Sequence, residues 1–126
     1  MPETTRDPKR RVLVLDDEER VAQAIGRTLE PDHDVKVMTR PRQALDALAA
    51  GESFDVILCD LVMPEMSGMD FYAAVQKAAP ASASRIIFMT GGVPTLRARY
   101  FLEQVGRPCI EKPLDMKRLE ALISAA

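Results

Sequence analysis

The chain lacks the features that mark membrane, nucleic-acid-binding and disulfide-rich proteins. No apolar run approaches the roughly 20 residues that span a bilayer, and the polar N-terminus has no apolar signal core. The formal net charge is −2, so the basic excess of a duplex-binding surface is missing. The two cysteines, Cys59 and Cys109, lie in apolar stretches, as expected of core thiols in a reducing cytoplasm. We therefore predict a cytoplasmic protein with no direct contact to membrane or nucleic acid.

Common cofactor motifs are missing as well. The one histidine, His33, lies in an acidic turn and is expected on the surface, so no cluster of histidine and cysteine points to zinc. Neither a Gly-x-Gly-x-x-Gly nor a Walker motif occurs, and the acidic run 16–19 would repel phosphate there. These absences argue against a flavin or dinucleotide binder.

The composition is that of one soluble globular domain. Of the 126 residues, 47% are hydrophobic and 29% are charged. Residues 1–10 are predicted to form a flexible leader or linker, because Pro2, Asp7 and Pro8 interrupt any regular element there. Residues 11–126 are predicted to form the domain.

Short apolar runs alternate with longer helical patterns along the domain. Strands are predicted at 12–15, 35–37, 54–59, 86–89 and 108–111, and helices at 21–29, 41–50, 67–79, 94–104 and 116–123. Five strand–helix pairs in strict alternation predict an α/β fold with a parallel sheet covered by helices on both faces.

Chemically active side chains follow four of the five predicted strands. Asp16 and Asp17 follow the first strand, Asp60 the third, Thr90 the fourth and Lys112 the fifth. The site of an open α/β sheet lies at the carboxyl ends of its strands. If these four strands surround one crevice, three carboxylates, a hydroxyl and an ammonium group meet there.

Such a cluster predicts phosphoryl chemistry assisted by magnesium. Three close carboxylates repel one another, and an all-oxygen ligand set favours Mg²⁺. A carboxylate beside Mg²⁺ and a lysine can act as a nucleophile towards phosphorus. Asp60, alone at the tip of a central strand, is the predicted acceptor, and Lys112 and Thr90 would hold the phosphoryl oxygens.

Each piece has an ordinary structural explanation when taken alone. Asp16 and Asp17 could form a helix N-cap, and Asp60 could be a turn residue. Thr90 with the two glycines that follow could be a simple turn. The functional interpretation depends on their joint position at the strand ends.

These residues resemble the receiver domain of two-component response regulators. The resemblance runs from about Arg11 to Ser124. The motifs that carry it are Asp16-Asp17-Glu18, Asp60 with Leu61-Val62-Met63-Pro64 and Gly68, Thr90, and Lys112-Pro113.

The resemblance implies a flavodoxin-like sheet in the order 2-1-3-4-5 with five helices. It implies that Asp60 takes a phosphoryl group from a phosphohistidine on a histidine kinase or phosphotransfer domain. Asp17, Asp60 and the Val62 carbonyl would bind Mg²⁺, and Asp16 would act mainly through water. Thr90 and Lys112 would hold the phosphoryl group, and the Lys112–Pro113 bond would be cis. Such a domain is not an enzyme in its own right but assists its own phosphorylation and dephosphorylation.

Some positions depart from the family pattern. Cys109 stands where the family usually has Tyr or Phe, so the switch would depend on Thr90 and the following loop, with Tyr100 and Phe101 as the nearest aromatics. Val62 and Gly92 offer no side-chain hydrogen bond to a hydrolytic water, which predicts a long-lived phosphoryl group.

Two surfaces are expected to bind partners. By analogy, the output surface would comprise residues 94–104, 108–111 and 116–123, with Arg97, Arg99 and Tyr100 as candidates. A phosphotransfer helix would dock on Ala22, Ile25 and Gly26, unless these residues simply cover the core. The domain could be free-standing, excised from a longer protein, or the receiver of a hybrid histidine kinase. The last possibility is suggested because residues 89–92 and the helix predicted after them resemble the receivers at the ends of such kinases.

Two alternatives remain open. A degenerate receiver would act only as a protein-interaction module, although it would usually have lost an acid, the threonine or the lysine. A small Mg²⁺-dependent phosphatase of the haloacid dehalogenase kind would carry Asp-x-Asp, and here Asp60-Leu61-Val62 lacks the second acid.

Overall fold

The computed structural model describes residues 9–126, so most of the predicted leader, residues 1–8, lies outside the described residues. Five parallel strands form one sheet in the order β2-β1-β3-β4-β5, which confirms the predicted fold class and strand order. The strands are β1 (Arg11–Leu15), β2 (Asp34–Met38), β3 (Val56–Asp60), β4 (Ile86–Thr90) and β5 (Cys109–Glu111).

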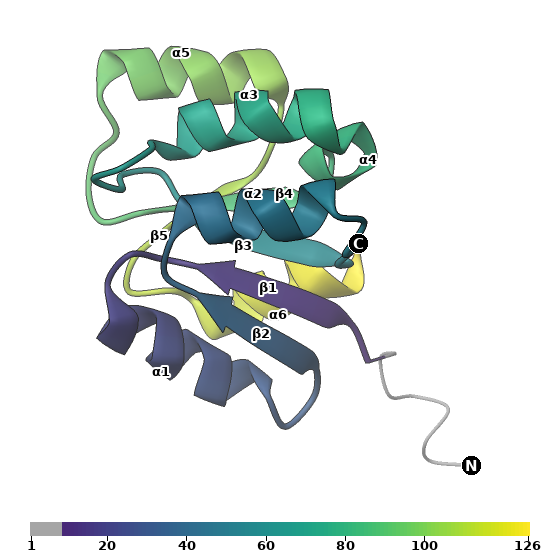
Figure 1. Cartoon of the computed structure of the whole chain (residues 1–126). Helices are drawn as coiled ribbons and strands as arrows, with labels where there is room; N and C mark the ends of the chain where they lie inside the picture. Colours follow the sequence, from purple (N-terminus) through teal and green to yellow (C-terminus); the bar gives the residue numbers. More distant parts are fainter. Residues whose placement is uncertain (1–8) are drawn as a thin grey trace.

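Six helices cover the sheet within the described part of the chain. They are α1 (Glu19–Leu29), α2 (Pro41–Ala49), α3 (Gly68–Ala78), α4 (Pro80–Ala83), α5 (Leu96–Val105) and α6 (Met116–Ser124). Helices α1 and α6 pack on one face, and α2, α3 and α5 on the other (Figure 1). None of the helices in residues 9–126 is long and apolar enough to cross a bilayer.

The short helix α4 was not predicted, because the pattern indicated five helices. Ala79 adopts φ −152° and ψ 70°, which ends the helical path of α3. Pro80 then begins a new turn, where its missing N–H needs no partner.

The core consists of two apolar layers separated by the sheet. All five residues of β3 and of β4 are buried, as expected for central parallel strands. Ile57 and Cys59 point towards the α2, α3 and α5 layer, whereas Val56 and Leu58 point towards α1 and α6. Burying a large apolar side chain contributes roughly 1.5–3 kcal/mol, so these layers hold the strand ends in fixed positions.

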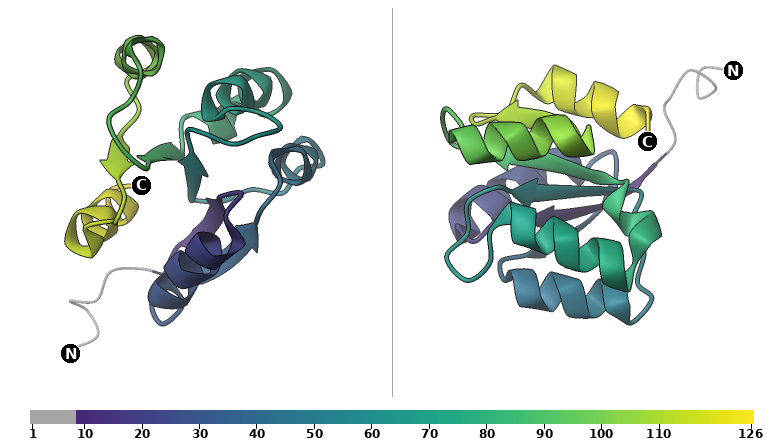
Figure 2. Two further views of the ribbon diagram at one scale, coloured as in Figure 1. Left: turned by 90° about the vertical axis from the view of Figure 1, so that its left-hand side faces the viewer. Right: turned by 90° about the horizontal axis from the view of Figure 1, so that it is seen from above.

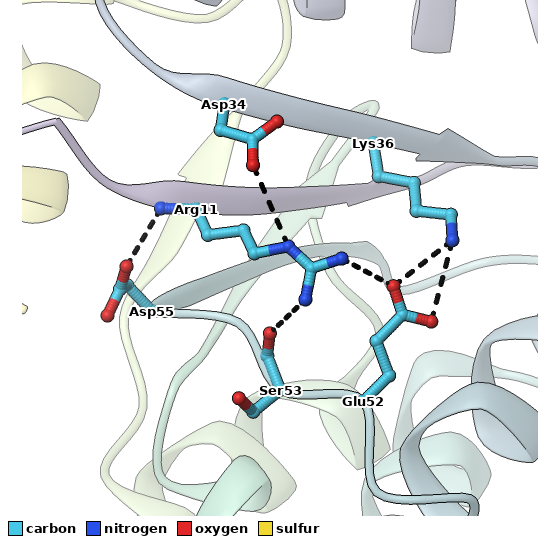
Figure 3. A network of polar contacts seen from close by, with 6 residues as sticks. All are labelled: Arg11, Asp34, Lys36, Glu52, Ser53 and Asp55. Carbon is cyan, nitrogen blue, oxygen red and sulfur yellow. Dashed lines mark hydrogen bonds and ion pairs between the residues drawn. The ribbon is translucent and has the colours of Figure 1, made fainter.

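A polar network joins the amino ends of β1, β2 and the segment before β3 (Figure 3). Arg11 donates to Glu52 at 2.6 Å and to the Ser53 carbonyl at 2.7 Å, and its backbone N–H donates to Asp55 at 2.8 Å. Lys36 of β2 also binds Glu52, at 3.1 Å. The network therefore fastens the sheet at the end opposite to the predicted site.

The surface position predicted for His33 is wrong. The residue is 4% exposed, and its Nδ1 accepts a hydrogen bond from the Arg10 N–H at 3.2 Å. Its Nε2 lies 2.9 Å from Glu120 of α6. Because Nδ1 accepts from an amide, the neutral ring carries its proton on Nε2 and donates to Glu120.

The structure supports the alternative interpretation of one face of α1. Ala22, Ile25 and Gly26 are buried on the inner side of the helix. A Cβ on Gly26 would lie 2.9 Å from Val37 Cγ2 of β2, which shows how closely this face meets the sheet. These residues cover the core, which was the alternative interpretation.

Candidate functional site

The predicted site residues lie at the carboxyl ends of four neighbouring strands. The left panel of Figure 2 looks onto the edge of the sheet where these strands end. Asp60 and Thr90 are the last residues of β3 and β4, Asp16 follows β1, and Lys112 follows β5. Asp16 is fully buried, and Asp60 is only 5% exposed.

Three carboxylates form a compact oxygen cluster. Asp16, Asp17 and Asp60 each offer one oxygen, and these oxygens lie within 4.8 Å of one another. Hard oxygen ligands at this spacing fit Mg²⁺ or Ca²⁺ and do not suit zinc, which favours nitrogen and sulfur. The donor set therefore fits the predicted cation.

Lys112 brings the positive charge to this cluster. Its Nζ donates to Asp16 Oδ2 at 2.6 Å and lies 3.5 Å from Asp60 Oδ2. The following Lys112–Pro113 peptide bond is cis, as the resemblance implied. One ammonium thus faces three acids, which leaves an uncompensated negative charge.

The charge imbalance changes the ionisation of the site. Burial and the nearby charge of Asp16 raise the pKa of Asp60 to about 6, although Lys112 opposes this shift. Burial disfavours the Lys112 ammonium, but its hydrogen bond to Asp16 and the charges of Asp16 and Asp60 outweigh burial and raise the lysine pKa. A cation at the cluster would favour the ionised Asp60.

The loop that follows Asp60 is held in place by the start of α3. Asp60 Oδ1 accepts a long hydrogen bond from the Val62 N–H at 3.5 Å. The Gly68 N–H donates to the Leu61 carbonyl at 2.8 Å, and Ser67 caps α3 by accepting from the Asp70 N–H. The first turn of α3 therefore contacts the backbone next to Asp60.

Thr90 completes the site from β4. Its hydroxyl donates to the Gly92 carbonyl at 3.0 Å, and its own carbonyl accepts from the Lys112 N–H at 2.7 Å. A cavity of about 570 Å³ is lined by Thr90 together with Asp17, Asp60, Val62 and Lys112. The predicted residues thus meet around one cavity, with Asp16 buried beside it.

Exposed apolar side chains lie in the lining of this cavity and on helix α5, and some of them were missed. Val62 is 75% exposed, Val93 78%, Leu96 83% and Tyr100 65%. Sequence reasoning named Val62 and Tyr100 but overlooked Val93 and Leu96. Leu96 and Tyr100 are four residues apart on α5, a spacing that places them on the same helix face and could have indicated the stripe.

The two cysteines differ in burial. Cys59 is fully buried, as predicted, whereas Cys109 is only half-buried. Cys109 pairs with Phe88 in the sheet register, and the Phe101 ring of α5 meets the Phe88 ring edge-on with centroids 5.5 Å apart. Tyr72 of α3 also meets Phe101, at 5.6 Å. An aromatic cluster thus links α3, β4 and α5 beside Cys109.

Comparisons with known proteins agree with this arrangement. A family model described as the response regulator receiver domain matches residues 12–124. The protein-glutamate methylesterase/protein-glutamine glutaminase 1 of Caulobacter vibrioides is 32% identical over 111 residues, which are 85% of this chain and 31% of that protein. The two-component response regulator ORR3 of Oryza sativa is 28% identical over 120 residues, 92% of each chain. The chain spans about 30% to 44% of the length of the first three curated relatives.

Solved structures share the fold. A response regulator receiver domain protein from Clostridium thermocellum superposes with a TM-score of 0.79 at 29% identity, covering 91% of each chain. A response regulator receiver protein from Pseudomonas putida gives a TM-score of 0.82 at 22% identity, covering 94% of this chain and 98% of that one. The latter likeness concerns the fold alone.

Proposed function

The chain belongs to the response regulator receiver domain family, and on this premise we propose that Asp60 accepts a phosphoryl group in two-component signalling. Receiver domains of two-component systems pair with histidine kinases or phosphotransfer proteins, so the donor is a phosphohistidine. The observation that carries the proposal is the cavity that Asp60 shares with Asp17, Thr90 and Lys112. A cytoplasmic location is part of the proposal and suits the free thiols of Cys59 and Cys109.

The acid cluster would hold Mg²⁺ through Asp17, Asp60 and the Val62 carbonyl, with Asp16 acting through water. A bound divalent cation supplies charge neutralisation on a phosphoryl oxygen. Lys112 lies 3.5 Å from Asp60 and would stabilise a second oxygen, and the Thr90 hydroxyl a third. Each of the three phosphoryl oxygens would thus have a partner that stabilises its charge.

In the transfer step, an ionised Asp60 oxygen forms a bond to phosphorus while the phosphorus–nitrogen bond of the phosphohistidine breaks. The electron pair of that bond remains on the imidazole nitrogen, which leaves as neutral imidazole when the other ring nitrogen carries a proton. The residues of this chain position the group in line and neutralise charge.

The same step would operate the switch. The Thr90 hydroxyl must leave the Gly92 carbonyl to reach a phosphoryl oxygen, and this would move the loop that leads into α5. Phe101 of α5 contacts Phe88, two residues before Thr90 on the same strand, and so replaces the aromatic that β5 lacks. The exposed apolar side chains of Val93, Leu96 and Tyr100 would form the output surface, with Arg97 and Arg99 beside them.

This switch can be followed by NMR. We expect the amide signals of residues 91–101 to shift when Mg²⁺ and beryllofluoride, a phosphoryl mimic, are added. Shifts confined to residues 16–18 and 60–62 would contradict a response of α5.

The donor helix would dock beside α1 around Val21 and Ala24, where Ile25 is the one residue of the expected docking face that contributes. A cavity of about 540 Å³ lies between α1 and the segment after β5, lined mainly by apolar groups that include Val21, Ala24 and Leu114. Lys112 lines both this cavity and the cavity that contains Asp60. A helix laid here would therefore bring its phosphohistidine next to Asp60.

The docking step can be separated from the chemistry. Ala24→Glu should abolish transfer from autophosphorylated histidine kinases tested as a panel, while leaving phosphorylation by acetyl phosphate unchanged. Gln23→Glu adds the same charge at an exposed α1 position outside the cavity and is the control. Equal transfer to both variants would exclude this groove.

The central experiment compares the wild type with Asp60→Asn after incubation with Mg²⁺ and acetyl phosphate. We expect a mass gain of one phosphoryl group in the wild type only. A gain that survives Asp60→Asn would place the acceptor elsewhere. No gain in the wild type would favour the interaction module, and continued turnover of a phosphate monoester would favour the phosphatase.

A further inference from the structure

Helix α3 begins directly against the backbone of the phosphoacceptor. A Cβ built on Gly68, its first residue, would lie 2.7 Å from the Asp60 carbonyl oxygen and 2.9 Å from Leu61 Cα. Cβ atoms essentially never approach other atoms within 3.0 Å. Both neighbours are backbone atoms, so no side-chain rotation can relieve the collision.

Space, not backbone conformation, requires glycine at this position. Only Gly51 and Gly106 have positive φ among the described residues, so the conformation of Gly68 is open to any residue. At the same time the Gly68 N–H donates to the Leu61 carbonyl at 2.8 Å. The first turn of α3 is thus held against the 60–61 peptide by a hydrogen bond that a side chain at 68 would force apart.

We propose that Gly68 is a positioning residue for the acceptor, and this inference rests on the proposed function of Asp60. The contact of α3 with residues 60 and 61 sets the backbone from which the Asp60 carboxylate and the Val62 carbonyl project. Both groups belong to the proposed Mg²⁺ site. Displacing this peptide therefore misplaces two cation ligands and the nucleophile together.

The perturbation is Gly68→Ala. We expect Mg²⁺ affinity to fall about tenfold, the lower end of the range for residues that support metal ligands. We expect the rate of phosphorylation by acetyl phosphate at saturating Mg²⁺ to fall about 100-fold, as expected of a misplacement of about 1 Å.

Gly26→Ala is the matched control. A Cβ on Gly26 would also fall below 3.0 Å from a neighbour, but that neighbour is the Val37 side chain on β2. Both variants should lose stability in urea, and both rates are divided by the folded fraction measured by circular dichroism. Only Gly68→Ala should lose Mg²⁺ affinity and phosphorylation rate per folded molecule.

The outcomes separate this inference from the function on which it rests. If the wild type is active and Gly68→Ala and Gly26→Ala have the same Mg²⁺ affinity and the same phosphorylation rate per folded molecule, the positioning role is overturned and the proposed function stands. A wild type that neither binds Mg²⁺ nor takes a phosphoryl group would overturn both. If Gly68→Ala does not fold, Ser67→Ala loosens the same turn by removing its cap, and unchanged Mg²⁺ affinity there would refute the inference.

Discussion

The ionised Asp60 carboxylate should destabilise the metal-free fold. Burial and the charge of Asp16 raise its pKa to about 6, compared with 3.8 for an ordinary aspartate. The difference between these two pKa values corresponds to about 3 kcal/mol of unfolding free energy, at roughly 1.36 kcal/mol for each pH unit between them. Replacing this group by a neutral amide of similar shape removes the penalty.

The sign follows from proton binding. Between pH 3.8 and about 6 the folded state holds the Asp60 proton and the unfolded state does not, so stability falls as pH rises through this window. Below this window both states are protonated, and above it the loss is complete. Asp60→Asn should therefore match the wild type near pH 3.5 and exceed it by about 3 kcal/mol at pH 7.

The assay is urea unfolding followed by far-ultraviolet circular dichroism, with chelator present, from pH 3.5 to 8. Asp46→Asn, at an exposed position of α2, is the matched control, and no comparable pH-dependent gain is expected there. Added Mg²⁺ should reduce the stability difference between Asp60→Asn and the wild type, because the ion binds the folded wild type. A gain for Asp60→Asn that is constant across pH, or absent at pH 7, would refute the electrostatic reasoning.

Three further predictions concern other parts of the molecule. Lys112→Met removes the ammonium beside Asp16 and Asp60, so the pKa of Asp60 should rise further above about 6 in a carbon-13 NMR titration of its carboxyl; an unchanged pKa would contradict this. Val62→Asn should shorten the phosphoryl lifetime by giving water a hydrogen-bond partner, measured as phosphate release, whereas equal lifetimes, or loss within seconds from the wild type, would count against it. His33→Ala removes a buried ring with two polar contacts and should lower the unfolding free energy by about 1–3 kcal/mol at pH 7, and a loss below about 0.5 kcal/mol would show that these contacts contribute little.

The parallel sheet and the position of the site residues at its strand ends could be predicted because both follow from short-range patterns. Alternating runs imply parallel strands, and parallel strands bring their carboxyl ends to one edge. Asp60, Thr90 and Lys112 each follow an apolar run, so their strand-end positions were readable before any contact was known. The strand order, the cis bond and the assignment of Asp17, Asp60 and the Val62 carbonyl as direct cation ligands came from the family resemblance.

Features that depend on distant contacts could not be predicted. His33 is buried because Glu120 of α6, 87 residues away, lies beside its ring. The apolar spacing on α1 indicated one inward face, but it did not show that a cavity would lie beside Val21 and Ala24. Cys109 and Phe101 of α5 likewise both pack at the border of the same core cluster, which the spacing of apolar residues did not indicate.

Acidic groups at the two ends of the sheet are compensated in different ways, and this contrast indicates where a cation would bind. At the amino end, hydrogen bonds from Lys36 and Arg11 lower the pKa of Glu52, so its charge is compensated within the chain. At the carboxyl end, burial and the charge of Asp16 raise the pKa of Asp60, and the ammonium of Lys112 offsets this rise only in part. The first arrangement stabilises the fold by itself, whereas the second is stabilised when a cation arrives. Relief of this burial cost and of the repulsion between the acids would therefore contribute to the affinity of the cluster for the proposed cation.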